Sequence, residues 1–304
     1  MHTKMTVSLL TKIISLILLS CGQFAFSGDN GEENGGEVDW DRWAIHDPSS
    51  RGEIQYGPYN TILRTLIDNS TDITSMRYSL LKAPASLQYI ETFFQYLQDI
   101  PVSQLNRDEQ YAYWLNVHNL GLIELLVVKN GLRGKLKKAR GLPGSPGLLW
   151  SETRFTIEGQ ALSLEDVEQK IIFRQWPDPH SLYGLSYGVK GSPPMSKIAF
   201  TGKNVHARLK LMGKYYLRTE NILNIKKDKV TLSSLYVWNK SSLFQNSDKE
   251  IFSHLQGLVS KGMARKLSRQ VDIDREKFSW RSVSISQKRA TGSQSIGARP
   301  GGIN

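Results

Sequence analysis

Two stretches of this sequence hold side chains that could carry nucleophilic or acid–base chemistry. Residues 180–195 read HSLYGLSYGVKGSPPM, in which Gly191 and Ser192 precede two prolines. A serine hydroxyl is almost wholly protonated at neutral pH and needs a neighbouring base before it can attack a substrate. His180 and His118 are the candidate bases. The alternative is structural, because Ser192 also suits the N-cap of a helix that begins at the first proline.

The second stretch is a helix predicted over residues 106–128. It is apolar nearly all round, which is typical of a buried central helix, yet Asn116, His118 and Asn119 stand in its middle. Buried polar groups cost about 1 kcal/mol or more each unless they are hydrogen-bonded. These three side chains therefore have partners, either structural, as for a core histidine, or catalytic.

Because buried polar groups can satisfy one another, we predict one shared pocket for four of these residues, namely Asn116, His118, His180 and Ser192. Glu168 and Arg174 lie on a helix predicted over residues 163–174, where an acid beside an apolar stripe points to a buried partner. They support the pocket in a catalytic interpretation and form structural ion pairs otherwise.

The sequence predicts no cofactor and no metal. Its six histidines show no ligand spacing, and no glycine-rich phosphate loop occurs. Cys21 is the only cysteine, which excludes a disulfide scaffold.

The elements that must position these residues are mostly helical. Periodicity predicts helices at 58–68, 85–98, 106–129, 163–174, 193–200, 203–218 and 247–267, strands near 155–157 and 183–187, and a hairpin within 221–232. Asn106 is the predicted N-cap of the central helix, with Glu109 in the capping-box position. Few strands scattered among helices indicate the α+β class: a helix-rich single domain with a central buried helix and a small mixed sheet. We place it at residues 54–285, after a flexible linker at 28–53 and before a disordered basic tail at 286–304.

The N-terminus resembles a secretory signal over residues 1–27. Positive charges precede an apolar core that is too short to span a bilayer comfortably. Cleavage before Gly28 follows small residues at −3 and −1. Alternatively, the sequence LLSC ending at Cys21 resembles a lipobox, with the signal at 1–20 and Cys21 lipidated. We therefore expect an exported protein, in the periplasm or at the outer membrane, without a transmembrane helix in its mature chain.

The net charge of the chain indicates what kind of partner it could bind. The net charge is +11, and residues 129–140 hold six basic residues and no acid. Outside the cytoplasm nucleic acid is not the expected partner, whereas an anionic envelope surface is the natural counter-charge. Simple solubility is the alternative, and the partner itself stays unknown.

Five segments in order resemble the domain of unknown function 547 family, in its bacterial exported branch. They read NRDEQYAYWLNVHNLGLI, LSLEDVEQKIIFR, DPHSLYGLSYGVKGSPPM, LSSLYVWNKSSLF and FSWRSV. The resemblance spans roughly residues 54–285 and implies an α+β domain of unestablished activity.

The chain departs from the family pattern at three places. Ser192 replaces the cysteine of the usual Ser-Cys-Pro-Pro, His118 replaces a tyrosine between the two asparagines, and Ser242 replaces an aspartate. If family members are thiol hydrolases, this chain lacks the thiolate. It is then either a binding or scaffold protein, or a hydrolase or acyl transferase that uses Ser192 with a histidine base.

Overall fold

A helix buried on nearly every side, α4 (Arg107–Val128), stands at the centre of the fold. Every side chain from Glu109 to Ile123 is buried, as its all-round apolar pattern predicts. Asn106 is its N-cap, because its Oδ1 accepts a hydrogen bond from the Glu109 amide at 3.0 Å. The Glu109 carboxylate does not close a capping box. It accepts instead from the amides of Ile54 and Gly202, and so joins two distant loops to the start of α4.

The computed structural model describes residues 38–67, 75–128, 150–219, 222–227 and 229–283. The signal segment with Cys21, the basic run at 129–140 and the tail at 286–304 lie outside these residues. From Trp40 onward the chain forms one compact unit. Part of the predicted linker belongs to it, since Trp43 is buried edge-on against Trp114 with ring centroids 4.9 Å apart.

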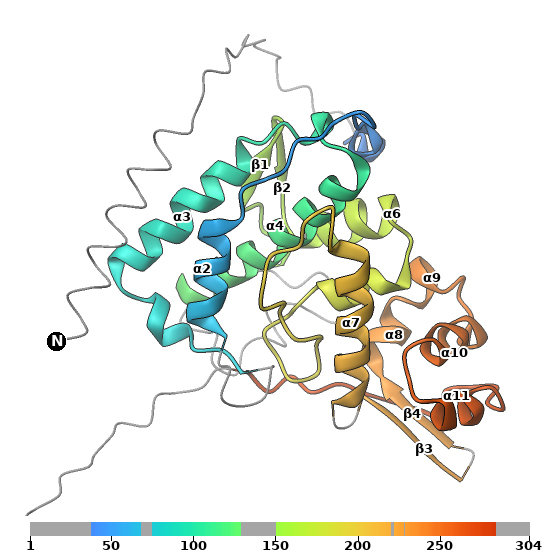
Figure 1. Cartoon of the computed structure of the whole chain (residues 1–304). Helices are drawn as coiled ribbons and strands as arrows, with labels where there is room; N and C mark the ends of the chain where they lie inside the picture. Colours follow the sequence, from blue (N-terminus) through green and yellow to red (C-terminus); the bar gives the residue numbers. More distant parts are fainter. Residues whose placement is uncertain (1–37, 68–74, 129–149, 220–221, 228, 284–304) are drawn as a thin grey trace, which may run out of the picture. The chain divides into compact units, whose positions relative to one another are not determined.

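Helices make up most of the described chain, so the α+β, helix-rich class is confirmed. Figure 1 shows α2 and α3 on one side of α4, and α7 with the C-terminal elements on the other. The helices besides α4 are η1 (Trp40–Ala44), α2 (Gly57–Leu66), η2 (Tyr78–Leu81), α3 (Pro84–Gln98), η3 (Val102–Gln104), η5 (Asp166–Ile172), α6 (Phe173–Gln175), η6 (Pro179–Gly184), α7 (Val205–Arg218), α8 (Ser234–Trp238), α9 (Lys240–Leu243), α10 (Asp248–Gln256) and α11 (Lys261–Leu267).

Two small sheets complete the described part of the fold. β1 (Phe155–Ile157) and β2 (Gln160–Leu162) form an antiparallel hairpin. β4 (Lys229–Ser233) pairs antiparallel with β3 (Leu223–Lys226) and parallel with β5 (Arg275–Lys277). The small mixed sheet is therefore the one that β3, β4 and β5 build.

Three predicted elements are wrong. The single helix predicted at 247–267 is divided into α10 and α11, because Ser260 begins a new helix as its N-cap. Residues 183–187 are not a strand, because the 3₁₀ helix η6 occupies Pro179–Gly184. Residues 193–200 are not a helix. At the end of that segment the Ala199 amide donates to Asn60 Oδ1 and the Phe200 amide to Asn116 Oδ1, so side chains satisfy backbone groups that a helix would have used.

The last described residues return to the middle of the chain. The amides of Lys190 and Gly191 donate to the carbonyls of Arg281 and Ser279, both at 2.9 Å. Val283 in turn donates to Gly188 and accepts from Met76. A Cβ on Gly191 would lie 2.6 Å from the Ser279 nitrogen, so this backbone approach requires glycine.

Candidate functional site

The side chains of the two asparagines in α4 form hydrogen bonds with backbone groups of other segments. Asn116 forms a pair of hydrogen bonds with the amide and carbonyl of Phe200, at 3.0 and 2.8 Å. Asn119 donates to the Gly184 carbonyl at 2.7 Å and accepts from the Ser186 amide at 3.1 Å. Both side chains thus fasten irregular segments to the central helix, which accounts for two of the three polar groups that the sequence places inside it.

His118 faces a buried carboxylate. Its ring is 0% exposed, and Nε2 lies 3.7 Å from Glu168 Oε2, beyond hydrogen-bond distance. Neither ring nitrogen of His118 has a hydrogen-bond partner. Glu168 Oε1 accepts from the Tyr187 hydroxyl at 3.1 Å and from Gln169 at 2.8 Å. The prediction that the acid has a buried partner is therefore correct.

The helix that carries Glu168 explains how an acid comes to point inward. Residues Asp166–Ile172 form a π-helix, η5, which widens the turn relative to an α-helix. Such π-turns occur often at functional sites. Ser163 caps the segment, since its hydroxyl accepts from the Asp166 amide and donates to the Asp166 carboxylate. Nothing in the residue pattern distinguishes this π-helix from the predicted α-helix.

Ser192 is buried and makes its hydrogen bonds with backbone atoms. Its Oγ accepts from the Tyr187 amide at 3.2 Å and lies 2.9 and 3.2 Å from the carbonyl oxygens of Val189 and Pro193. The single hydroxyl proton is thus directed at carbonyls, and none of these bonds in the described structure reaches a histidine. Ser192 is no helix N-cap either, because no helix follows it.

Arg174 lies at the surface. Its guanidinium forms a two-pronged pair with Asp41, with Nε and one terminal nitrogen 2.9 and 2.8 Å from the two carboxylate oxygens. Both side chains are about half exposed or more. The pair ties η5–α6 to η1, so the structural interpretation of Arg174 is the one that its contacts support.

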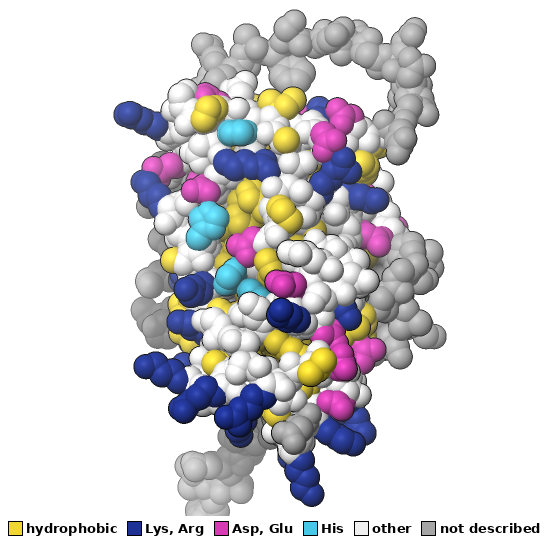
Figure 2. All heavy atoms as spheres, turned by 90° about the vertical axis from the view of Figure 1, so that its right-hand side faces the viewer, with side chains coloured by type: hydrophobic (Ala, Val, Ile, Leu, Met, Phe, Trp, Pro, Cys, Tyr) yellow, Lys and Arg dark blue, Asp and Glu magenta, His cyan; other side chains and the backbone are white. Residues whose placement is uncertain are grey.

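His180 belongs to a cluster that the sequence did not reveal. Its Nδ1 lies 2.8 Å from Asp178 Oδ1, and its ring meets the ring of His254 edge-on at 4.7 Å. His254 Nε2 lies 2.8 Å from the Tyr183 hydroxyl, which lies 3.2 Å from the hydroxyl of Tyr236. His180 is 29% exposed, so solvent reaches the cluster. Figure 2 shows histidine and acidic side chains close together on the face of the molecule that it displays.

The pKa of His254 is shifted by its surroundings. Burial, followed by the neighbouring His180, lowers the pKa of His254 from 6.5 to about 4, although Asp178 opposes this. Burial acts to raise the pKa of Asp178, but its hydrogen bonds from His180 outweigh burial and lower it. His254 is therefore neutral at physiological pH and can accept a hydrogen bond from the Tyr183 hydroxyl.

This shift predicts acid sensitivity. The unfolded chain binds a proton at His254 below about pH 6.5, whereas the folded protein does so only near pH 4. Stability should therefore be highest above pH 6.5 and fall by up to about 3 kcal/mol between pH 6.5 and 4. Denaturant unfolding at several pH values measures it. His254→Gln keeps a partner for Tyr183 and should flatten this slope; an unchanged slope would contradict the assignment.

The predicted shared pocket is thus divided. Asn116 and His118 share α4, and Ser192 joins the His118 neighbourhood through Tyr187, whose hydroxyl reaches Glu168. His180 instead contacts Asp178, Tyr183 and His254. The two histidines proposed as bases belong to separate clusters.

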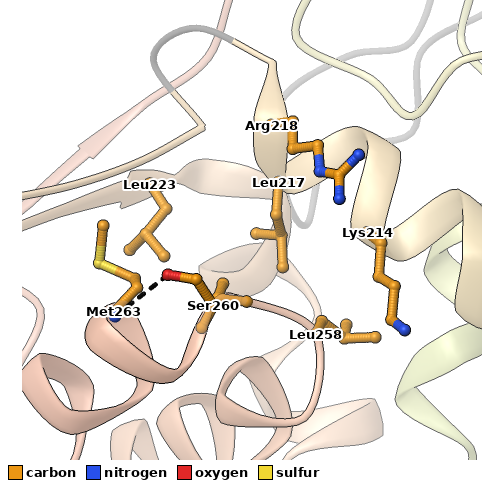
Figure 3. Close-up of a pocket in the computed structure, with 8 residues that line it drawn as sticks. Lys214, Leu217, Arg218, Leu223, Leu258, Ser260 and Met263 are labelled. Atoms are coloured by element: carbon orange, nitrogen blue, oxygen red, sulfur yellow. Dashed lines mark hydrogen bonds between the residues drawn. The ribbon is translucent and has the colours of Figure 1, made fainter.

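A cleft of about 370 Å³ opens between α7, β3 and α11. Figure 3 shows Leu217, Leu223 and Met263 around one space, with Lys214 and Arg218 beside it on α7. The remaining lining comes from the α10–α11 connection, at Leu258, Val259 and Ser260. The Ser260 hydroxyl is occupied as the N-cap of α11 by the Met263 amide. Nothing in the sequence patterns singled out this cleft.

No group of three histidine, cysteine or acidic side chains among the described residues could hold a metal ion. None of the described helices is long and apolar enough to cross a membrane.

Comparison with known proteins identifies one family. Residues 102–217 match the model described as Protein of unknown function, DUF547. No curated protein and no solved structure matches the chain. The matched segment runs from η3 to the end of α7 and includes α4, Glu168, His180 and the Gly191–Ser192 turn, but not His254 or α11. The resemblance noted in the sequence is therefore confirmed over residues 102–217, which match the DUF547 family of proteins of unknown function.

Proposed function

We propose that this protein is an exported bacterial envelope protein that binds or scaffolds, and that Ser192 has no catalytic role. The observation that carries this proposal is the bonding of the Ser192 hydroxyl, whose proton is directed at the carbonyls of Val189 or Pro193. A nucleophilic serine must instead give its proton to a base. Ser192 stands where the family usually has cysteine, so the position retains a small polar side chain that stabilises the turn.

The alternative is a hydrolase or acyl transferase that uses Ser192 with a histidine base. It would require the serine to leave its backbone partners, because its present contacts include neither His118 nor His180. His118 is also wholly buried. No observation at Ser192 favours this alternative.

Export rests on the sequence of residues 1–27, with its positive start, short apolar core and two cleavage sites. The mature chain begins at Gly28 or at a lipidated Cys21. An intact-mass measurement on the protein recovered from the envelope fraction tests this, and a mass that retains residues 1–20 would contradict both forms.

Reactivity of Ser192 tests the proposed function directly. A fluorophosphonate probe labels activated serines and should leave Ser192 unlabelled in the wild-type protein. Ser192→Ala should cost about 1 kcal/mol of unfolding free energy, because one buried hydrogen-bonding group is lost. Peptide mapping after labelling and denaturant unfolding give the two readings.

Ser181→Ala is the matched control. Ser181 is also fully buried, and its hydroxyl bonds to Tyr111 and the Trp176 carbonyl. Its replacement should destabilise to a similar extent. If the wild-type protein is labelled at Ser192 and the Ser192→Ala protein is not, the catalytic alternative is correct.

A further inference from the structure

Three described stretches that contribute to the α7–β3–α11 cleft carry positive charge only. Residues 205–219, 222–227 and 256–269 contain ten lysines and arginines and no aspartate or glutamate. Glu220 and Asp228, which follow the first two stretches, lie outside the described residues, and Asp272 lies three residues beyond the third stretch. Figure 2 shows Lys and Arg side chains gathered toward the lower part of this face, at the height of β3, β4 and α11 in Figure 1, with acidic side chains near the opposite edge.

The described acids form no salt bridges with these cations. They do so with other surface cations, such as Lys203 with Glu53 and Lys240 with Asp248. Like charges that crowd together without counter-charges repel one another, and they attract an anionic partner.

α7 arranges this charge next to apolar surface. Lys210, Lys214 and Arg218 recur every four residues and so share one helix face. Leu211 and Tyr215 follow the same spacing on the adjacent stripe and are 43% and 41% exposed. A basic stripe beside exposed apolar and aromatic side chains is typical of helices that lie in the interface of a membrane.

The cleft also combines apolar with basic side chains. Its wall is apolar and half-buried at Leu217, Leu223 and Met263, while Lys214 and Arg218 stand beside it (Figure 3). A ligand that fills it must therefore be apolar at one end and anionic at the other. Its volume is at the lower end of ligand pockets, which suits one acyl chain rather than a whole lipid.

We infer that this face docks on an anionic phospholipid surface and that the cleft takes part of one lipid. Lys214 and Arg218 bind the headgroup phosphate, and the three apolar side chains cover the first methylenes of an acyl chain. The breadth of the charge, ten cations over three elements, fits a surface that carries many phosphates better than a single soluble anion. The inference rests on the proposed envelope role, because an exported envelope protein meets such lipids.

Vesicle binding tests this inference on the purified mature protein. Flotation with vesicles of phosphatidylcholine mixed with phosphatidylglycerol should recover the protein, whereas vesicles of phosphatidylcholine alone should not. Binding should weaken steeply with added salt. The double charge reversal Lys214→Glu with Arg218→Glu should lower the affinity by about 100-fold or more, because two attractions become two repulsions.

Two further variants separate the cleft from general charge. Arg51→Glu with Lys170→Glu changes the net charge equally, at exposed positions outside the cleft, and should lower the affinity less than tenfold. Leu217→Asn with Met263→Gln leaves the charge unchanged and should lower the affinity about tenfold, because the apolar contact is lost. Circular dichroism confirms that each variant is folded.

Three outcomes would overturn the inference. The first is an equal loss of vesicle affinity in the two charge-reversal variants. The second is absence of binding to the anionic vesicles. The third is binding of inorganic phosphate or glycerol phosphate at the cleft by a protein that does not bind the vesicles. Failure of the proposed envelope role is measured separately, by the mature mass and by Ser192 labelling. If the protein is exported but does not bind anionic vesicles, only this inference is contradicted.

Discussion

Trp114→Ala is expected to lower the free energy of unfolding by about 3–5 kcal/mol, because a large buried side chain is lost. Trp114 is 0% exposed at the middle of α4. Its ring meets Trp43 edge-on at 4.9 Å and Tyr113 at 5.1 Å. Alanine would leave a cavity between α4 and the η1 segment, which cannot collapse without moving both. Denaturant unfolding measures the loss.

Trp114→Phe is the informative companion. The indole Nε1 of Trp114 has no hydrogen-bond partner, so phenylalanine gives up volume but no hydrogen bond. It should therefore cost less than half as much as alanine. A loss below 1 kcal/mol for alanine would show that α4 does not have the central position described above.

Glu168→Ala is expected to cost about 3–5 kcal/mol, for a different reason. The carboxylate is 1% exposed and serves the Tyr187 hydroxyl, Gln169 and, at longer range, His118. Its removal leaves these buried polar groups without that acceptor, and each such loss costs about 1–3 kcal/mol. Equilibrium unfolding in urea is the measurement.

Glu168→Gln preserves an oxygen that can accept from Tyr187 and should recover much of the stability. Tyr187→Phe combined with Glu168→Ala completes a double-mutant cycle, in which the two losses should be non-additive by more than 0.5 kcal/mol. A gain in stability on Glu168→Ala would contradict a structural role. It would indicate instead an acid retained for function at the expense of stability.

Local signals predicted the long elements well. α4 and α7 were predicted with nearly their observed bounds, because long periodic patterns and the Asn106 cap act within the segment itself. The hairpin of β3 and β4 follows for the same reason. The segments at 183–187 and 193–200 were mispredicted, because their amides and carbonyls bond to Asn119 and Asn116 of α4, which are far away in sequence.

As with the fold, only part of the candidate site could be predicted from the sequence. That the polar groups of α4 have structural partners could be deduced from the cost of burying them. For Glu168 the sequence predicts a buried partner without naming it, and the structure places His118 and Tyr187 beside it. His254 was not foreseeable, because 71 residues separate it from Tyr183. The basic cleft was also missed, since α7, β3 and α11 meet only in the folded chain.

The return of the last described residues to Gly188 and Gly191 affects the order in which the chain can fold during synthesis. α4 and its family segment are complete at residue 217, but the contacts of Met76 with Val283 and of Val189 with Ser282 form only when residues 279–283 have left the ribosome. A nascent chain that has reached α7 therefore still lacks one of the segments that join its first third to its middle. The contacts of residues 279–283 with Met76 and with Gly188–Gly191 can therefore form only after α7 has been synthesised.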